Sequence, residues 1–257
     1  MEMKTIIEKQ SGEILTTEAL SRHFGGLKAN TDINFSLRIG EIRAIIGPNG
    51  AGKTTFFNLI TGVLRPSSGK VFFKGSDITN LHPYQRVKLG IGRSFQSVNL
   101  FPDISIRENI ELAVQPYYKK KTNPFEVIDR KKIKRHVQEI LEKFEWEGNA
   151  QLKAGSLAHA DQKKLETMLA VACNPDLLLL DEPTAGLDEE ETQYVVKLIK
   201  EMAKDTTILL TDHDVQFVMD TATKISVLRQ GEIIAEGSPA EITANQQVQE
   251  AYFGGGA

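Results

Sequence analysis

The chain has 257 residues, of which 40% are hydrophobic and 25% charged; this ordinary globular mixture fits one large α/β domain, with or without an inserted subdomain. The net charge of −3 gives no reason to expect nucleic-acid binding, and the single cysteine, Cys173, excludes an intrachain disulfide. No secretory signal is evident and the longest aliphatic run, residues 177–180, is far too short to span a membrane, so we expect a cytoplasmic protein.

The N-terminal third is predicted to be rich in β-structure. EILTTEAL and DINFSL are short β-like segments, and FGG at residues 24–26 is a turn signal between them. EIRAII then predicts a buried strand that leads into a glycine loop and the helix start TTFFNLI. GKVFFKG predicts a further strand bounded by glycines.

The pattern changes between about residues 98 and 155, where prolines punctuate the chain and the β-like alternation stops. Apolar residues spaced by four, three, one and three form one face of an amphipathic helix: Ile133, Val137, Ile140, Leu141 and Phe144. We therefore interpret this region as a mainly helical insert.

Helix and strand alternate again after Asp161. DLLLLDE predicts a strand buried on both faces of a parallel sheet, with TTILLTD as its neighbour. KISVLRQGEIIAEG predicts a hairpin that turns at Gln230 and Gly231, and QQVQEAYFGGGA predicts a short helix before a glycine tail. There is no internal repeat, which indicates one domain of this kind and not two in tandem.

GPNGAGKT, residues 47–54, matches the phosphate-loop pattern G-x-x-x-x-G-K-[ST], between a predicted strand and a predicted helix. Glycines allow consecutive N–H groups to face phosphate oxygens, and the helix adds its positive N-terminus. Lys53 is expected to reach the β- and γ-phosphates and the Thr54 hydroxyl to coordinate Mg²⁺. The alternative is a chance glycine-rich turn. The candidate nucleotide-binding residues here are Gly47, Pro48, Asn49, Gly50, Ala51, Gly52, Lys53, Thr54 and Thr55.

Two carboxylates, Asp181 and Glu182, follow the four-leucine strand at its C-terminal end, where open α/β sheets bind ligands. Asp181 is a candidate Mg²⁺ ligand, through water, and Glu182 a candidate general base toward the γ-phosphate. The alternative is that the pair only ends a strand and caps a helix.

In this order, GPNGAGKT, GRSFQ, LLLLDEP, AGLD and LLTDHD resemble the ATP-binding subunits of ABC transporters. The resemblance covers about residues 13–253. FGGLKA, GIGRSFQSVNLFPDISIRENI and VQEAYFG are most similar to the branched-chain amino acid and urea uptake branch.

The resemblance implies roles for residues that carry no strong signal alone. Gln96 matches the glutamine that senses Mg²⁺ and the attacking water, His213 the histidine that contacts the γ-phosphate, and Asp188 the aspartate that crosses the dimer interface. Phe24 matches the aromatic residue that stacks on adenine. Taken alone, Gln96 could be a surface residue, His213 a helix cap and Phe24 part of the core.

The resemblance also implies an α/β fold: a RecA-like P-loop NTPase core with an antiparallel β subdomain (residues 13–97 and 162–253) and an inserted helical subdomain (98–161). ATP and Mg²⁺ are the implied cofactors. The implied partners are transmembrane permease subunits, a second ATP-binding subunit and a solute-binding protein, with this chain on the inner face of the membrane.

One motif departs from the family. Where family members carry Leu-Ser-Gly-Gly-Gln, this chain has Leu157 followed by Ala158, His159, Ala160 and Asp161. In the family this signature covers the ATP held by the partner subunit. Loss of the serine hydroxyl removes a hydrogen bond to a charged group, which typically costs about 1.5–3 kcal/mol. His159 could partly replace the serine as a donor or simply be exposed.

The phosphate loop of the chain itself is intact, so the resemblance favours a heterodimer: a partner with an intact signature completes one competent site, and the mirror site hydrolyses ATP slowly. The alternative function is a nucleotide-binding regulatory subunit with little hydrolysis, and a third is a soluble member in iron–sulfur assembly or repair. The basic run at residues 117–136 is interpreted as a solvated helix face, with lipid or membrane-subunit contact as the alternative.

Overall fold

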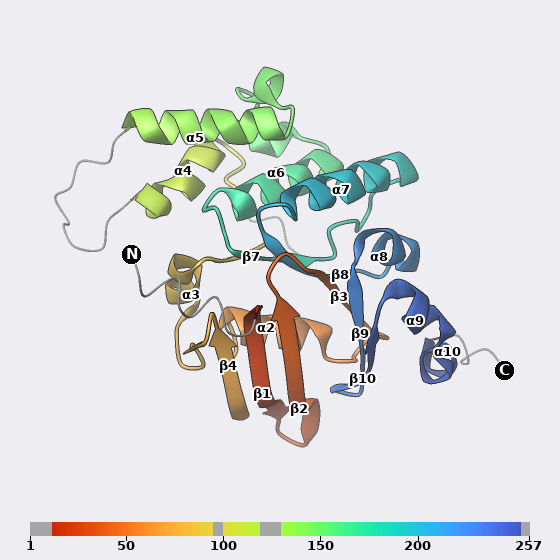
Figure 1. The fold of residues 1–257 in the computed structure, drawn as a ribbon. Coiled ribbons are helices and arrows are strands. Elements are labelled where there is room, and N and C mark those ends of the chain that lie inside the picture. The colour runs from red at the N-terminus through yellow and green to blue at the C-terminus, as the bar shows by residue number, and fades with distance from the viewer. Residues whose placement is uncertain (1–11, 95–99, 119–129, 253–257) are drawn as a thin grey trace.

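Helix α2 (Lys53–Thr61) packs between two β-sheets of different kind (Figure 1). The computed structural model describes residues 12–94, 100–118 and 130–252. Phe56 and Phe57 of α2 belong to one buried cluster, which also contains Leu15 of the smaller, four-stranded sheet and Leu209 of the larger, six-stranded sheet. The helix that follows the phosphate loop is therefore held on both sides.

The larger sheet is mostly parallel and has the order β10-β9-β3-β8-β7-β6. The strand β9 pairs in parallel with β3 and antiparallel with β10, so the predicted hairpin at Gln230 and Gly231 is confirmed. The predicted pairing of DLLLLDE with TTILLTD is also confirmed. The strands are β3 (Ile42–Ile46), β6 (Ile91–Arg93), β7 (Leu177–Asp181), β8 (Thr207–Thr211), β9 (Lys224–Arg229) and β10 (Glu232–Gly237).

Successive residues of the central strands enter different cores, because side chains alternate across a strand. In β7, Leu177 and Leu179 belong to the cluster with α2, whereas Leu178 and Leu180 belong to the cluster on the opposite face. All five residues of β3, β7 and β8 are buried. This two-sided burial explains why these strands are continuously apolar and not alternating.

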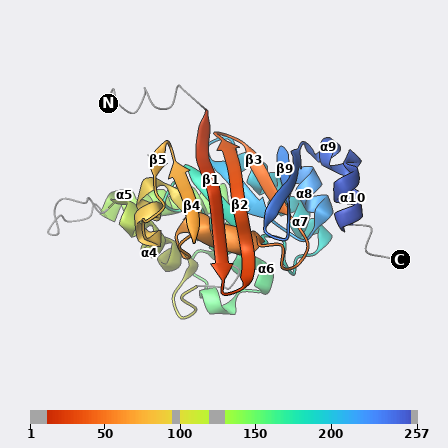
Figure 2. The ribbon, with the colours of Figure 1, turned by 90° about the horizontal axis from the view of Figure 1, so that it is seen from below.

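The smaller sheet is antiparallel and lies over the other side of α2, with the order β2-β1-β4-β5 (Figure 2). Long strands β1 and β2 meet at the predicted turn after Phe24, where Gly25 has a φ of 58°. The strands are β1 (Glu13–Phe24), β2 (Leu27–Arg38), β4 (Ser68–Phe73) and β5 (Ser76–Asp77).

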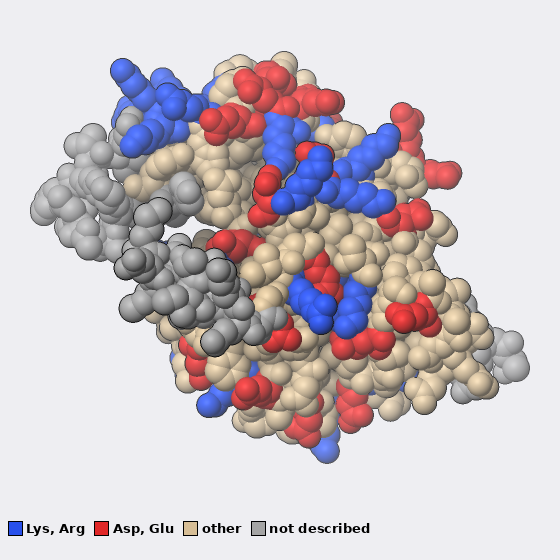
Figure 3. Space-filling view, viewed as in Figure 1, with Lys and Arg blue, Asp and Glu red and all other residues tan. Residues whose placement is uncertain are grey.

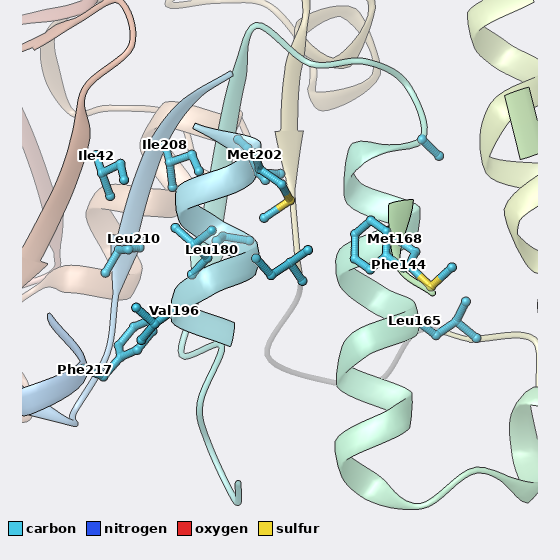
Figure 4. Packing of buried hydrophobic residues seen from close by; sticks show 14 of the residues in the cluster. Ile42, Phe144, Leu165, Met168, Leu180, Val196, Met202, Ile208, Leu210 and Phe217 are labelled. Carbon is cyan, nitrogen blue, oxygen red and sulfur yellow. The ribbon is translucent and has the colours of Figure 1, made fainter. Parts of the chain in front are cut away.

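Helices cover the face of the larger sheet that α2 leaves free. One buried cluster fills this space. Ile208 and Leu180 of the sheet lie beside Val196 and Met202 of the helix that covers it, and Phe144, Leu165 and Met168 form a second group of the same cluster, farther from the sheet (Figure 4). The helices on this side are α4 (Ile106–Tyr118), α5 (Arg130–Lys143), η1 (Glu147–Asn149), η2 (Ala154–Ser156), α6 (His159–Val171), α7 (Glu189–Met202) and α8 (Val215–Thr221). The remaining ones are α3 (Pro83–Leu89), α9 (Pro239–Ala244) and α10 (Gln246–Tyr252).

The described part of the insert is mainly helical, and the predicted apolar face of α5 is buried. Its opposite face is basic and exposed, at the upper left of Figure 3: Arg130, Lys131, Lys132, Lys134 and Arg135. Helix α6 begins at His159 and continues to Val171, so the expected boundary at residue 161 falls inside a helix. No helix among the described residues is long and apolar enough to cross a membrane.

Candidate nucleotide-binding site

The phosphate loop lies between β3 and α2, at the C-terminal edge of the parallel sheet, and its geometry depends on glycine. Gly50 and Gly52 have φ angles of 79° and 105°, in the left-handed region that other residues rarely adopt. A Cβ on Gly52 would lie 2.3 Å from the carbonyl oxygen of Ala29. The loop therefore depends on glycine both for its backbone angles and for space beside β2.

Neighbouring segments hold the loop in place. Gly231, in the turn between β9 and β10, donates its N–H to the carbonyl oxygen of Ala51 at 3.0 Å. Nδ2 of Asn30 in β2 donates to the carbonyl oxygen of Gly52 at 3.3 Å. The loop is therefore fastened to both sheets, which favours a preformed phosphate cradle.

Lys53 is buried at the start of α2, with 7% of its surface exposed. Its Nζ donates to the carbonyl oxygens of Gly47 at 2.6 Å and Pro48 at 3.2 Å. Burial lowers the pKa of the Lys53 ammonium, and the nearby carboxylates of Glu182 and Asp181 oppose that shift. The ammonium thus lies inside the loop, near both carboxylates, while Thr54 beside it is exposed.

Asp181 ends strand β7, and its side chain is fully buried. Nη2 of Arg93 donates to its Oδ2 at 2.7 Å, whereas Oδ1 has no hydrogen-bond partner among the described residues. Burial raises the pKa of the Asp181 carboxyl, and the hydrogen bond from Arg93 opposes the rise. A buried carboxylate oxygen without a hydrogen-bond partner is suited to binding a group from outside the protein, such as a bound ligand.

Glu182 and His213 form a close pair: Oε1 of the carboxylate lies 2.6 Å from Nε2 of the imidazole. The Glu182 side chain is 21% exposed and the His213 side chain 53%, so the pair lies at the surface. Glu182 has a φ of 51°, a strained angle for a residue with a Cβ. Such strain is typical of functional sites, because the surrounding structure must enforce it.

The structure brings Lys53, Asp181, Glu182 and His213 into one neighbourhood, but other candidates lie elsewhere or cannot be placed. Gln96 lies outside the described residues. Asp188 caps α7, accepting a hydrogen bond from the N–H of Glu191 at 2.9 Å.

Phe24 is 42% exposed, so it is not part of the core. The guanidinium carbon of Arg22 lies 4.6 Å from its ring centroid.

The signature segment forms the start of α6. Ala158 is the N-cap but supplies no side-chain hydrogen bond, and Asp161 lies in the first turn. The imidazole of His159 lies against Gly186, where an added Cβ would be 3.2 Å from its Cε1 and Nδ1. A pocket of about 440 Å³ separates this start of α6 from α7 and includes Asp161 and Asp188 in its lining.

Two residues that organise the site carry no functional signal of their own in the sequence. Arg93 lies within GRSFQ, and Asp212 lies directly before His213 in LLTDHD. The buried Asp212 carboxylate accepts hydrogen bonds from the hydroxyl and N–H of Thr184 and from the N–H groups of His213 and Asp214. It thereby ties the loop after β7 to the loop after β8. Only an acidic residue just after an apolar strand could have signalled this.

Comparison with known proteins identifies the family. A family model described as ABC transporter matches residues 30–185, more than half of the chain. The chain belongs to this family. A second model, described as branched-chain amino acid ATP-binding cassette transporter, matches residues 232–257 of the cassette.

Curated relatives match the cassette over nearly its whole length. It is 37% identical over 254 residues to the high-affinity branched-chain amino acid transport ATP-binding protein LivG of Salmonella typhimurium, covering 95% of this chain and 99% of the relative. It is 34% identical over 253 residues to BraF of Pseudomonas aeruginosa, a protein of the same description, with the same coverage.

Solved structures match the fold. A nucleotide-free ATP-binding cassette from an ABC transporter gives a TM-score of 0.82 at 30% identity, covering 93% of this chain and 98% of the other. A dimeric post-hydrolysis cassette, MJ0796 with ADP and Pi, gives 0.75 at 25% identity, covering 88% and 99%. The family and fold predicted from the sequence are confirmed, and the cassette is the ATPase subunit of a transport system.

Proposed function

We propose that this cassette binds Mg²⁺-ATP at the phosphate loop, hydrolyses it, and thereby drives uptake of branched-chain or related amino acids through transmembrane permease subunits. The observation that carries the proposal is the Glu182–His213 pair, 2.6 Å apart, beside Lys53 and the buried Asp181 carboxylate. The printed descriptions of LivG and BraF support the cargo class.

Each side chain near the loop has a distinct task in this mechanism. Lys53 exchanges its bonds to the Gly47 and Pro48 carbonyls for the β- and γ-phosphates of ATP, whose charge matches its ammonium. Glu182 accepts a proton from the attacking water, and His213 holds the Glu182 carboxylate in place and meets the γ-phosphate. Phe24 presents an exposed ring on which adenine stacks.

The residues present fit a magnesium ion. Asp181 offers an unpartnered buried oxygen, and Thr54 offers an exposed hydroxyl at the start of α2. The bound ion would neutralise charge on the phosphate oxygens. Gln96 is the third proposed member of this group. Oxygen ligands of this kind are the ones that Mg²⁺ prefers.

Full activity requires a second ATP-binding subunit, with Asp188 and the signature segment at the shared interface. The cassette works on the inner face of the membrane, with a solute-binding protein on the other side. Support comes from the relatives' descriptions as transport ATP-binding proteins and from the dimeric cassette of similar fold.

The test is the Glu182→Gln variant in the complex with its natural partner subunits. We expect ATP turnover at this chain's own phosphate loop to fall by about 10²- to 10⁴-fold, because the general base is lost. Nucleotide affinity should change little, since the amide keeps the size of the side chain. Wild-type turnover no higher than that of the variant would favour a regulatory subunit that binds nucleotide without hydrolysing it.

A further inference from the structure

Arg93 joins three elements at one point of the site. It ends strand β6, and its Nη1 donates to Oδ1 of Asn58 at 2.6 Å and to Oγ1 of Thr61 at 3.2 Å, both in α2. Its Nη2 donates to Oδ2 of Asp181 in β7 at 2.7 Å. The same guanidinium therefore links the helix that begins with Lys53 and Thr54 to the carboxylate at the end of β7.

This link is buried: the Arg93 side chain is 10% exposed and the Asp181 side chain 0%. Burial of two charges is costly unless their geometry is good and their hydrogen bonds are made. Arg93 supplies such a hydrogen bond to Oδ2 of the Asp181 carboxylate, but not to Oδ1. Oδ1 of Asp181 has no partner among the described residues, and a buried acceptor without a partner costs about 1–3 kcal/mol.

Ser94 holds the backbone of the same aspartate. Its N–H donates to the carbonyl oxygen of Leu179 at 2.9 Å, and its Oγ accepts from the N–H of Asp181 at 3.3 Å. Two consecutive residues of the chain thus fix both the main chain and the side chain of Asp181. A carboxylate held in this way has its remaining oxygen aimed in one direction.

We propose that Arg93 is a positioning residue for the magnesium site: it holds Oδ2 of Asp181 so that Oδ1 faces the ion, and it fixes that oxygen relative to Thr54 through α2. The inference rests on the proposed function, because it concerns the same metal-nucleotide site. Metal-binding carboxylates are commonly oriented by a hydrogen-bond partner of this kind.

Two simpler roles make different predictions. If Arg93 only supplies a positive charge, it competes with the cation, and its removal tightens metal binding. If Arg93 only fastens the edge strand β6, its removal lowers stability and leaves metal binding unchanged. Asn58 separates positioning from charge, because Asn58→Ala removes the shorter of the two hydrogen bonds from the guanidinium to α2 and leaves the ion pair with Asp181 intact.

The experiment measures ADP binding to the isolated full-length chain by calorimetry, in EDTA and over a series of Mg²⁺ concentrations. ADP is used because it is not hydrolysed. The variants are Arg93→Met, Arg93→Lys, Asn58→Ala and the double variant Asn58→Ala with Arg93→Met. Arg65→Met is the matched control, because it removes the same charge from an exposed position. Thermal unfolding of each variant reports stability separately.

We expect Arg93→Met to raise the Mg²⁺ concentration needed for half of the affinity gain by about 10-fold. Asn58→Ala should raise it by a smaller factor, the double variant should equal Arg93→Met, and Arg93→Lys should lie between wild type and Arg93→Met. ADP affinity in EDTA should stay within about twofold, because no phosphate contact changes. Arg65→Met should behave as wild type.

The proposal would be overturned if Arg93→Met needed a lower Mg²⁺ concentration than wild type for half of the gain in ADP affinity. It would also be overturned if that concentration were unchanged while the stability of the variant fell. Should Arg93→Met fail to fold, Asn58→Ala decides, and an unchanged Mg²⁺ dependence there also counts against it. If wild type itself binds ADP with no Mg²⁺ dependence, the proposed function fails, and this outcome is distinct from failure of the Arg93 proposal.

Discussion

His213 is the residue of the site whose role can be separated most cleanly from stability. Its side chain is 53% exposed and its described side-chain contact is with Glu182. Substitution therefore removes little packing, and a change in activity reports on the chemistry.

We predict that His213→Ala lowers ATP turnover of the complex by about 10²-fold or more, because Glu182 loses the group that orients it. The unfolding temperature should stay close to that of wild type, since substitutions at exposed positions usually change stability by less than about 0.5 kcal/mol. Steady-state ATPase assays and thermal unfolding check the two halves. A fall in both would mean that His213 supports the fold instead.

At this scale the sequence indicated the residues that follow a motif but not those that organise it. Lys53, Asp181 and Glu182 belong to recognisable patterns with fixed spacing. Arg93 acts through partners that lie between 32 and 88 positions away along the chain. Asp212 acts through Thr184, which lies 28 positions away. Such contacts are set by the pairing of β6, β7 and β8, which no local pattern specifies.

At the scale of elements, the phosphate loop offers a matched pair of glycines. Gly50 and Gly52 both have positive φ, but a Cβ on Gly50 meets nothing within 4 Å, whereas one on Gly52 meets Ala29 at 2.3 Å. The two sites therefore separate backbone strain from steric clash.

Gly50→Ala should lose about 1–2 kcal/mol of unfolding free energy, the usual cost of the left-handed angle. Gly52→Ala should lose more and should also abolish ADP binding, because the clash with β2 must displace the loop. Urea unfolding and calorimetry measure both quantities. Equal effects of the two variants would show that the contact with Ala29 is unimportant.

Arg86 joins α3 to the C-terminal end of α2 and is 1% exposed. Nη1 donates to the carbonyl oxygens of Leu59 and Ile60, and Nη2 to that of Thr79. Burial lowers the pKa of Arg86 to about 10, which leaves it charged at neutral pH. Its hydrogen bonds therefore take the place of the missing helical partners of α2.

We predict that Arg86→Met lowers the unfolding free energy by about 3 kcal/mol or more, because several buried carbonyl oxygens lose their donor. Lys88→Met, at an exposed position of the same helix, is the control and should change stability by less than about 0.5 kcal/mol. Urea unfolding measures both. A small effect of Arg86→Met would mean that water replaces the guanidinium.

The central strands and the amphipathic face of α5 could be predicted, since burial on two faces or one leaves a clear pattern. The short strands β5 and β6, with two and three residues, could not, because their pairing depends on neighbouring strands. The expected subdomain boundary at residue 161 falls inside α6, because the altered signature forms the first turn of a continuous helix that runs to Val171.

At the scale of the whole molecule, the altered signature makes the two ATP sites of the proposed dimer unequal. This chain has a complete phosphate loop of its own. Its signature, however, lacks the serine hydroxyl, and the His159 imidazole in it lies against Gly186. In the proposed dimer, both features would act on the site that uses the partner's phosphate loop. We therefore propose a heterodimer with one fast and one slow site, in which the partner carries an intact signature.

We predict that combining Ala158→Ser, His159→Gly, Ala160→Gly and Asp161→Gln raises hydrolysis at that slow site. The restored hydroxyl supplies a hydrogen bond to charged phosphate, worth about 1.5–3 kcal/mol. The glycines let backbone N–H groups approach and remove the imidazole from Gly186. The measurement is single-turnover ATP hydrolysis by the complex, compared with wild type.

The decisive background is Glu182→Gln in this chain, which silences its own site and leaves the partner's phosphate loop untouched. If the rebuilt signature acts in trans, the gain must persist in that background, because the improved site does not use Glu182 of this chain. If the gain in hydrolysis disappears in the Glu182→Gln background, the effect lies in the chain's own site, for example because His159→Gly removes the imidazole that lies against Gly186. No gain in either background would mean that the altered signature does not limit hydrolysis, and the asymmetric arrangement would then lose its physical basis.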